Sequence, residues 1–559
     1  MDDTGTQPER DTAPLSRRAF IGTGVVAAAG VSGLRLPGRA EGDDASRAAR
    51  VEREDFALDE ITVDQLQERM RSGAESASSI ARQYLARIDA IDHRGPALNA
   101  VIEINPDAMA IAEQLDAERK AGTVRGPLHG IPVLIKDNID TADRMKTSAG
   151  SLALADHVAA RDSFVAERLR AAGAVILGKT NLSEWANFRS THSSSGWSAR
   201  GGQTRNPYAL DRSPSGSSSG SGSAAAANYA TVTIGTETDG SVTSPASVAS
   251  LVGLKPTVGL VSRAGIVPIS HSQDTAGPMT RTVRDAAILL GALVGVDSRD
   301  PATRASAGRA PRDYATGLRA DALRGARIGV ARKKYTGYHP ATDGVFERAL
   351  DILRKQGAII IDPANLSTAG ELDAGELEVL MYEFKTNLDR YLGGIAASQP
   401  AHSLADVIAF NTRNADRELR YFGQEIMNMS VKKAPLTDPK YRAKLASGRR
   451  LAAAQGIDAT IARHRLDAIV APTQGPAWLI DLVNGDAGNG GSFTSPAAIA
   501  GYPHVTVPMG FVRGLPVGLS FVGRAWSEAR LLALAYAFEQ AGPARRKPMF
   551  AATADLSSA

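Results

Sequence analysis

The chain has 559 residues, of which 43% are hydrophobic and 22% are charged, a composition typical of a globular protein with a large core. The formal net charge is only +4 and we find no dense basic cluster, so the sequence gives nucleic-acid binding no support. The absence of cysteine excludes disulfides, thiolate nucleophiles, cysteine-ligated zinc and a lipid-modified N-terminal cysteine.

Residues 1–40 have the pattern of a twin-arginine export signal. The motif Ser-Arg-Arg-Ala-Phe-Ile begins at Ser16 and leads into an uncharged stretch of small and apolar residues at 19–34. That stretch is short and weakly apolar for a membrane span, so we expect no stable membrane anchor. Residues 38–40 fit a small-x-small cleavage site, and 41–54 follow as a charged spacer. We expect export to the periplasm or the medium; the alternative is a disordered basic tail.

Residues 56–120 have a helical pattern, within which 106–120 form a separate helix. A short apolar strand is predicted at 133–135, and Lys136 ends it. A lysine directly after a buried strand is more often a surface charge. The alternative is a buried amine whose lowered pKa lets it act as a base. The local pattern leaves both interpretations open.

Residues 173–180, Gly-Ala-Val-Ile-Leu-Gly-Lys-Thr, match the spacing of a phosphate-binding P-loop. In a P-loop the strand precedes the first glycine, and the four intervening residues form the loop. Here those four residues, 174–177, are themselves strand formers. We therefore predict a strand at 174–177 and no nucleotide site.

Two further segments are candidates for a substrate pocket. Trp185 and Phe188 either line an acyl pocket or belong to the core, and core is the commoner role. Residues 370–450 are mainly helical, with Phe384 and Leu388 on one helix face. We expect this segment to form the roof of the pocket.

The stretch 213–256 begins like a flexible linker, with seven serines and three glycines among its first eleven residues. It continues as an alanine-rich helical run, a β-branched strand at 230–234, a turn rich in Gly and Thr, and a second apolar segment. A linker has no reason to lead directly into buried segments. We expect a Gly/Ser loop whose small residues allow close approach of a substrate.

The remaining segments alternate between strands and helices. We predict a turn at 274–279, a helix at 283–294, strands at 326–331 and 466–470, and a last helix at 531–540. This alternation over about 400 residues indicates one α/β domain with a largely covered sheet.

Together, several of these segments resemble the amidase signature family. The motifs that carry the resemblance, which spans residues 56–540, are Gly216-Ser-Ser-Ser-Gly220, Gly240-Ser-Val242, Gly253-Leu-Lys-Pro256, His129-Gly-Ile-Pro132, Lys136-Asp-Asn138, Gly178-Lys-Thr-Asn181 and Gly514-Leu-Pro-Val-Gly-Leu519. The resemblance implies a single large α/β domain, placed at 55–550, with a central mixed β-sheet covered by helices on both faces. It also accounts for the P-loop-like segment, since Gly-Lys-Thr-Asn is ordinary in this family.

The resemblance also implies a Ser–cis-Ser–Lys catalytic set. Carried over by motif, the nucleophile is Ser241, the bridging cis-serine is Ser217 and the base is Lys136. The oxyanion and substrate-binding residues would be Thr238, Asp239 and Gly240, with the N–H of Ser241. The set needs no histidine, so we take His129, His192, His271 and His504 as structural or pocket residues. None of them lies in a Gly-x-Ser-x-Gly context.

This set suits amide hydrolysis. A serine hydroxyl needs a base to take its proton, and burial lowers the pKa of a lysine so that it is neutral enough to serve. The Ser217 hydroxyl, which both donates and accepts, would relay the proton from Ser241 to Lys136 and later return it to the leaving amine. Backbone N–H groups of the 238–241 loop would stabilise the oxyanion. We expect no cofactor and no metal.

Departures from the usual family pattern bear on the substrate. Position 243, often arginine in the family, is Thr243, and Gln273-Asp274-Thr275 resembles the branch of bacterial peptide amidases. The expected activity is therefore hydrolysis of a small-molecule or peptide amide, with ammonia released from C-terminal peptide amides. The alternatives are an aryl-acylamidase or esterase, a glutaminase like that of a tRNA amidotransferase, which the export signal disfavours, and an inactive binding protein. The sequence does not indicate an oligomeric state.

Overall fold

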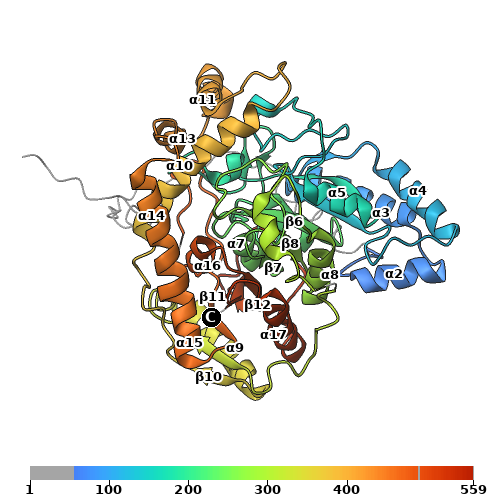
Figure 1. The fold of residues 1–559 in the computed structure, drawn as a ribbon. Coiled ribbons are helices and arrows are strands. Elements are labelled where there is room, and N and C mark those ends of the chain that lie inside the picture. Colours follow the sequence, from blue (N-terminus) through green and yellow to red (C-terminus); the bar gives the residue numbers. More distant parts are fainter. Residues whose placement is uncertain (1–55, 312, 489–490, 558–559) are drawn as a thin grey trace, which may run out of the picture.

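The computed structural model describes residues 56–557, except 312 and 489–490. The described residues form one α/β domain around an eleven-stranded sheet (Figure 1). The strand order is β1-β3-β2-β6-β8-β7-β12-β13-β11-β9-β10. The pairs β2–β3, β2–β6, β9–β11 and β9–β10 are parallel, and the other six pairs are antiparallel. The predicted mixed sheet is confirmed.

The strands of the sheet are β1 Val101–Ile104, β2 Pro132–Lys136, β3 Val175–Thr180, β6 Val232–Glu237, β7 Val252–Lys255, β8 Thr275–Thr280, β9 Arg327–Val330, β10 Ile359–Ile361, β11 Ala468–Pro472, β12 His504–Val512 and β13 Leu515–Val522. A separate hairpin pairs β4 Trp197–Ser198 with β5 Gly202–Gln203. Most predicted strands are present, displaced by one to three residues at their ends.

The helices are α2 Val63–Ser72, α3 Ala77–Ile88, α4 Ala108–Lys120, α5 Phe164–Ala171, α6 Ser219–Ala226, α7 Thr243–Val248, α8 Val283–Leu293, α9 Pro340–Lys355, α10 Asp373–Leu392, α11 Leu404–Arg413, α12 Ala415–Glu418, α13 Glu425–Ser430, α14 Pro439–Arg449, α15 Asp458–His464, α16 Ser495–Ala500 and α17 Glu528–Ala541. Local sequence explains many of their starts. In α2, for example, the Thr62 hydroxyl accepts from the N–H of Gln65, whose side chain accepts from the N–H of Thr62.

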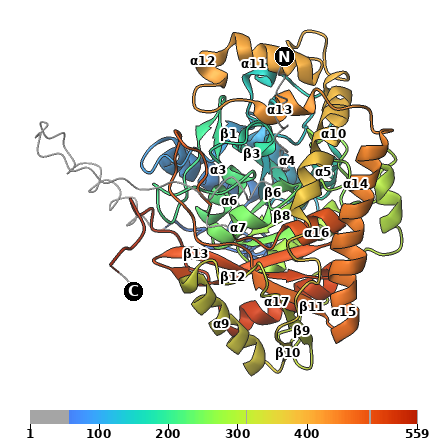
Figure 2. The same ribbon diagram turned by 90° about the vertical axis from the view of Figure 1, so that its left-hand side faces the viewer.

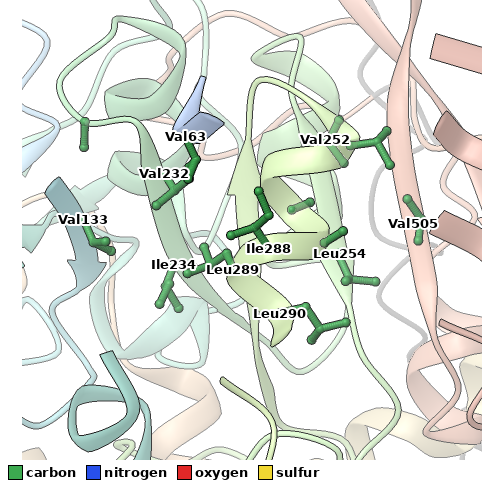
Figure 3. Packing of buried hydrophobic residues seen from close by; sticks show 14 of the residues in the cluster. Val63, Val133, Val232, Ile234, Val252, Leu254, Ile288, Leu289, Leu290 and Val505 are labelled. Carbon is green, nitrogen blue, oxygen red and sulfur yellow. The ribbon is translucent and has the colours of Figure 1, made fainter. Parts of the chain in front are cut away.

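Apolar clusters cover both faces of the sheet, as predicted. Along β11, Ala468 and Val470 belong to the main core, whereas Ile469 and Ala471 pack into a second cluster with Phe493. This alternation follows from the two-residue period of a strand. On the main-core face, residues 288–290 of α8 pack over the apolar side chains of β6 and β7 (Figure 3).

Two predictions about local structure were wrong. Residues 101–104 lie within the segment expected to be helical but form the edge strand β1. Residues 274–279 were expected to form a turn, but all of them except Asp274 lie within β8, which contains Gly277 and Pro278. A Cβ at Gly277 would clash with the carbonyl of Leu254, so the glycine serves close strand approach. Pro278 has no N–H to donate, and β7 pairs with β8 only beyond it.

The stretch 213–256 is not a linker. Its residues are almost all buried, and it contributes α6, β6, α7 and β7 to the interior. The helices α10 to α14, which we call the roof, come much later in the chain. α10 to α13 lie toward one end of the molecule, and α14 runs from there along one side (Figures 1 and 2). No helix of the described residues is long and apolar enough to cross a membrane.

Candidate active site

Lys136 is the last residue of β2, and its side chain is fully buried. Its Nζ donates to Ser217 Oγ at 2.7 Å, to Thr236 Oγ1 at 2.9 Å and to the carbonyl of Thr236 at 3.3 Å. β2 and β6 are parallel neighbours, which brings Thr236 alongside Lys136 although 100 residues separate them. The buried interpretation of this lysine is confirmed.

Burial lowers the pKa of Lys136 to about 7, although the negative charges of Asp274 and Glu237 oppose the shift. An amine with this pKa is neutral in a large fraction of molecules near neutral pH, so it has a lone pair to accept a proton. The three oxygen atoms around Nζ hold the amine in one position beside Ser217.

Ser217 follows a cis peptide bond from Gly216 and is fully buried just before α6. Because a Cβ on Gly216 would collide with the Ser183 hydroxyl, glycine fits this position. The N–H of Ser218 donates to the carbonyl of Ser241 at 3.1 Å. This backbone bond brings the Gly216–Ser217 turn alongside the loop that carries Ser241.

Ser241 lies in a tight loop between β6 and α7, and 9% of its surface is exposed. Gly240 has a φ of +79°, a conformation that glycine adopts readily. The Glu237 carboxylate accepts from the N–H groups of Val242 (2.8 Å) and Thr243 (2.9 Å), which fixes the chain after the nucleophile position. Thr243, where the family often has arginine, is therefore part of the support of this loop.

The loop 238–241 presents four backbone N–H groups, and none of them donates to another described residue. The loop is anchored through its carbonyls and its side chains instead. Thr238 Oγ1 donates to Asp274 at 2.6 Å, and Ser495 Oγ donates to Asp239 at 2.7 Å. Such N–H groups are what an oxyanion site requires. The assignment of this role to Thr238, Asp239 and Gly240 stays a prediction.

A cavity of about 300 Å³ opens beside these residues. It is lined by Asn187, Ser195, Ser215, Gly216, Asp239, Ser244, Glu376, Leu377, Leu380, Gln474, Trp478, Asp486, Gly488, Ser492, Thr494 and Ser495. Gly216 precedes the predicted relay serine, and Asp239 lies two residues before the predicted nucleophile. Leu377 and Leu380 come from α10, so the roof expected of residues 370–450 does border the cavity.

Trp185 and Phe188 belong to the core and do not line this cavity. The ring of Phe188 packs edge-on against Phe384 of α10 at a centroid distance of 4.9 Å. Both aromatic residues thus anchor the roof to the body. The P-loop interpretation is also excluded, because residues 175–180 form β3 and Lys179 is buried, with Nζ donating to the carbonyl of Ile139 at 2.6 Å.

Of the four histidines set aside in the sequence, none lines the cavity. His129 Nε2 lies 3.0 Å from the carbonyl of Leu115, and His504 Nε2 lies 2.6 Å from Ser520 Oγ within the sheet. His271 contacts Asn387 of α10. These contacts fit structural roles.

Sequence reasoning did not name Thr236 and Glu376 as site residues, and it gave Gln273 and Asp274 no structural role in the site. Thr236 holds the Lys136 amine, and Asp274 holds Thr238. Gln273 donates from Nε2 to the carbonyl of Thr238 at 3.3 Å and to Glu376 Oε1 at 2.9 Å, which joins the loop to the roof. The sequence does show Gln273-Asp274-Thr275 as a motif, but a strand threonine such as Thr236 gives no signal of its own.

A buried Lys–Ser pair beside a serine-bearing loop is an arrangement that hydrolases can use in place of a serine–histidine pair. The comparison with known families agrees: residues 79–532 match the Amidase family. The chain belongs to the amidase signature family and is an amidase, a hydrolase of amide carbon–nitrogen bonds.

Individual relatives span nearly the whole described domain. The chain is similar to the native peptide amidase of Stenotrophomonas maltophilia, with a TM-score of 0.84 and 52% identity over 88% of this chain and 99% of that one. A protein of Arabidopsis thaliana named "Probable amidase" is 42% identical over 89% of this chain and 93% of its own. The A-subunit of the glutamyl-tRNA(Gln) amidotransferase of Symbiobacterium thermophilum is 37% identical over 84% of this chain and 94% of its own.

Proposed function

We propose that this amidase releases ammonia from the C-terminal amide of peptides through an acyl-enzyme on Ser241. The observation that carries the mechanism is the 2.7 Å hydrogen bond between the buried Lys136 amine and Ser217. The peptide-amide substrate is supported by the likeness to a peptide amidase over 99% of that chain. The cavity beside Gly216 is also large enough for more than a carboxamide group.

In this mechanism the neutral Lys136 amine accepts the Ser217 proton while Ser217 takes the proton of Ser241. The Ser241 oxygen then attacks the amide carbon, and N–H groups of the 238–241 loop hold the oxyanion. The proton returns through Ser217 to the leaving nitrogen, so ammonia departs and an ester remains on Ser241. Water attacks that ester through the same relay, which frees the carboxylic acid and restores neutral Lys136.

The test is ammonia release from a panel of peptide amides, aryl amides, glutamine and esters. Peptide amides should give the highest kcat/KM. Ser241→Ala should abolish turnover of all of them while leaving the unfolding temperature close to that of the parent, because the substitution removes only one oxygen. Turnover retained in Ser241→Ala would refute the nucleophile assignment.

Glutamine hydrolysis is a second candidate, because the chain is 37% identical to the A-subunit of an amidotransferase. The same panel separates the two functions. A kcat/KM for glutamine above that for every peptide amide would favour the glutaminase, whereas the peptide-amide function requires the reverse order.

We also propose that the enzyme acts outside the cytoplasm. The support is the Ser-Arg-Arg-Ala-Phe-Ile motif from Ser16 and the uncharged stretch at 19–34, both of which lie outside the described residues. Fusion of residues 1–40 to a reporter that is active only after export tests this. Export should be lost when Arg17 and Arg18 are both replaced by lysine, and export that persists in this variant would refute the twin-arginine assignment.

A further inference from the structure

The charged side chains that line the candidate active-site cavity are all of one sign. Among its described lining residues, three are acidic, Asp239, Glu376 and Asp486, and none is lysine, arginine or histidine. The chain as a whole carries a net charge of +4, so the acidic lining does not follow from composition. A concave site lined by one charge sign favours ligands of the opposite sign.

Asp239 is the acidic residue nearest to the predicted nucleophile in sequence. Its Oδ2 accepts from Ser495 Oγ at 2.7 Å, whereas its Oδ1 is buried and accepts no hydrogen bond from the described residues. A buried carboxylate oxygen without a donor is costly, and a donor supplied by a bound ligand would satisfy it. This oxygen therefore indicates that the cavity takes a ligand with a hydrogen-bond donor, a requirement that a cationic group on the substrate meets.

The other two carboxylates lie on different segments around the cavity. Asp486 accepts from the N–H of Ser195 at 3.0 Å and from Trp478 Nε1 at 2.9 Å. Glu376 belongs to α10 and accepts from Gln273 Nε2 at 2.9 Å. These hydrogen bonds fix where the two carboxylates lie, so the negative charge reaches from the nucleophile loop to the roof.

We propose that the cavity selects peptide amides with a cationic side chain, lysine or arginine, on the residue that bears the amide. The proposal deepens the peptide-amide function proposed above and rests on it. A substrate cation within several ångströms of these carboxylates, in a partly solvated cavity, should gain about tenfold in kcat/KM. A substrate carboxylate should lose a similar factor. The carboxylate product is repelled in the same way, which favours its release.

The experiment compares three acetylated tripeptide amides that differ only in the last residue: lysine, norleucine or glutamate. Norleucine matches the apolar stem of lysine without its charge. Ammonia release should give a kcat/KM about tenfold higher for lysine than for norleucine, and about tenfold lower for glutamate. Raising the salt concentration from about 0.05 to 0.5 M should shrink both ratios, because ions screen the cavity.

Three near-isosteric variants, Asp239→Asn, Glu376→Gln and Asp486→Asn, should each lower the lysine-to-norleucine ratio about two- to threefold. The matched control is Asp351→Asn, which removes an exposed carboxylate of α9. This control should keep the parental ratio. Because the readout is a ratio within each variant, a general loss of activity does not affect it.

Equal kcat/KM for the lysine and norleucine amides would overturn the charge preference and leave the peptide-amide function intact. A lysine preference that survives all three cavity variants would overturn its assignment to these carboxylates. No ammonia from any of the three peptides would instead refute the proposed function itself, so the two failures are distinguishable.

Discussion

The candidate catalytic centre and the roof above it are held together by different balances of polar and apolar contacts. In the centre, the Lys136 amine, the Ser217 hydroxyl and the Glu237 carboxylate are tied by hydrogen bonds to strands and to backbone N–H groups. In the roof, α10, α11 and α13 share an apolar cluster, which includes Phe384, Leu388, Leu404, Ile426 and Met427 together with Trp185 and Phe188 of the body. Hydrogen bonds also tie the roof to the body, for example from Ser270 Oγ to Glu383 at 2.5 Å and from the N–H of Leu152 to Glu418 at 2.7 Å.

This difference assigns the catalytic chemistry to the centre and the selection of substrates to the roof. Hydrogen bonds are directional, so the centre fixes atoms to within a few tenths of an ångström, as proton transfer requires. Apolar packing tolerates exchanges of similar volume, so the roof can vary in sequence without loss of fold. Substitutions in the centre should therefore reduce kcat, whereas those in the roof should change KM and substrate preference.

The largest expected effect is that of Lys136→Met. The change removes the predicted base but keeps a long, unbranched side chain in the buried site. We expect kcat/KM to fall about 10²- to 10⁴-fold, the usual contribution of a general base. Steady-state ammonia release, with the unfolding temperature as a check on folding, measures it.

Lys179→Met is the matched control for this substitution. Lys179 is also fully buried, on the neighbouring strand β3, but its amine binds the carbonyl of Ile139 and Thr147 Oγ1 away from Ser217. It should lose stability and keep most of its kcat where it folds. A Lys136→Met enzyme that loses less than tenfold would make Lys136 a structural residue.

The next effect is that of Gly240→Ala. The φ of +79° at Gly240 disfavours a side chain, and an added Cβ would lie 2.8 Å from Ser244 Oγ. The loop must therefore shift its N–H groups, and we expect kcat to fall about 10²-fold, as when an oxyanion donor is lost. KM for the same peptide amide should change much less.

Gly73→Ala controls for the backbone cost alone. Gly73 ends α2 with a φ of +77°, and nothing lies within 4 Å of an added Cβ. Both variants should lose stability in chemical denaturation, Gly240→Ala the more because of its added contact with Ser244, but only Gly240→Ala should lose activity. Equal kinetic loss in both would contradict a special role for the 238–241 loop.

The centre could be predicted from the sequence because its chemistry lies in short motifs. Lys136, Ser217 and Ser241 are each marked by small residues or by a strand end, and the adjacency of β2 and β6 then brings Lys136 to the loop. The sheet was predictable for a similar reason, because buried strands are apolar runs. The catalytic roles themselves still await the kinetics above.

The cavity and strand β8 were harder to predict, because they depend on contacts between segments that are distant in the chain. The cavity combines Asp239, Glu376 and Asp486, whose positions in the chain differ by more than 100 residues and share no local motif. Local rules also misled at β8, where Gly277 and Pro278 are typical of a turn. The strand tolerates them because β7 approaches closely at Gly277 and pairs with β8 only beyond Pro278.

The pH dependence of the centre is the third test. Because burial lowers the pKa of Lys136 to about 7, the amine is protonated and inactive below that pH. We expect kcat/KM to fall about tenfold per pH unit in acid and to level off above pH 8. The charge of Asp274 favours the protonated amine, so Asp274→Asn should move the midpoint to lower pH. A flat profile from pH 5 to 9 would contradict the lysine base.

The smallest effect is expected in the roof, for Leu377→Ala. Leu377 lines the cavity from α10, and its truncation removes apolar surface that a peptide would cover. We expect KM for a peptide amide to rise about fivefold with little change in kcat. Val431→Ala is the control, because Val431 packs on the same apolar cluster without lining the cavity. A small amide such as acetamide should not distinguish the Leu377→Ala variant from the parent. A clear difference between the two enzymes with acetamide would mean that the roof acts on the catalytic centre itself. The roof would then not be limited to substrate selection.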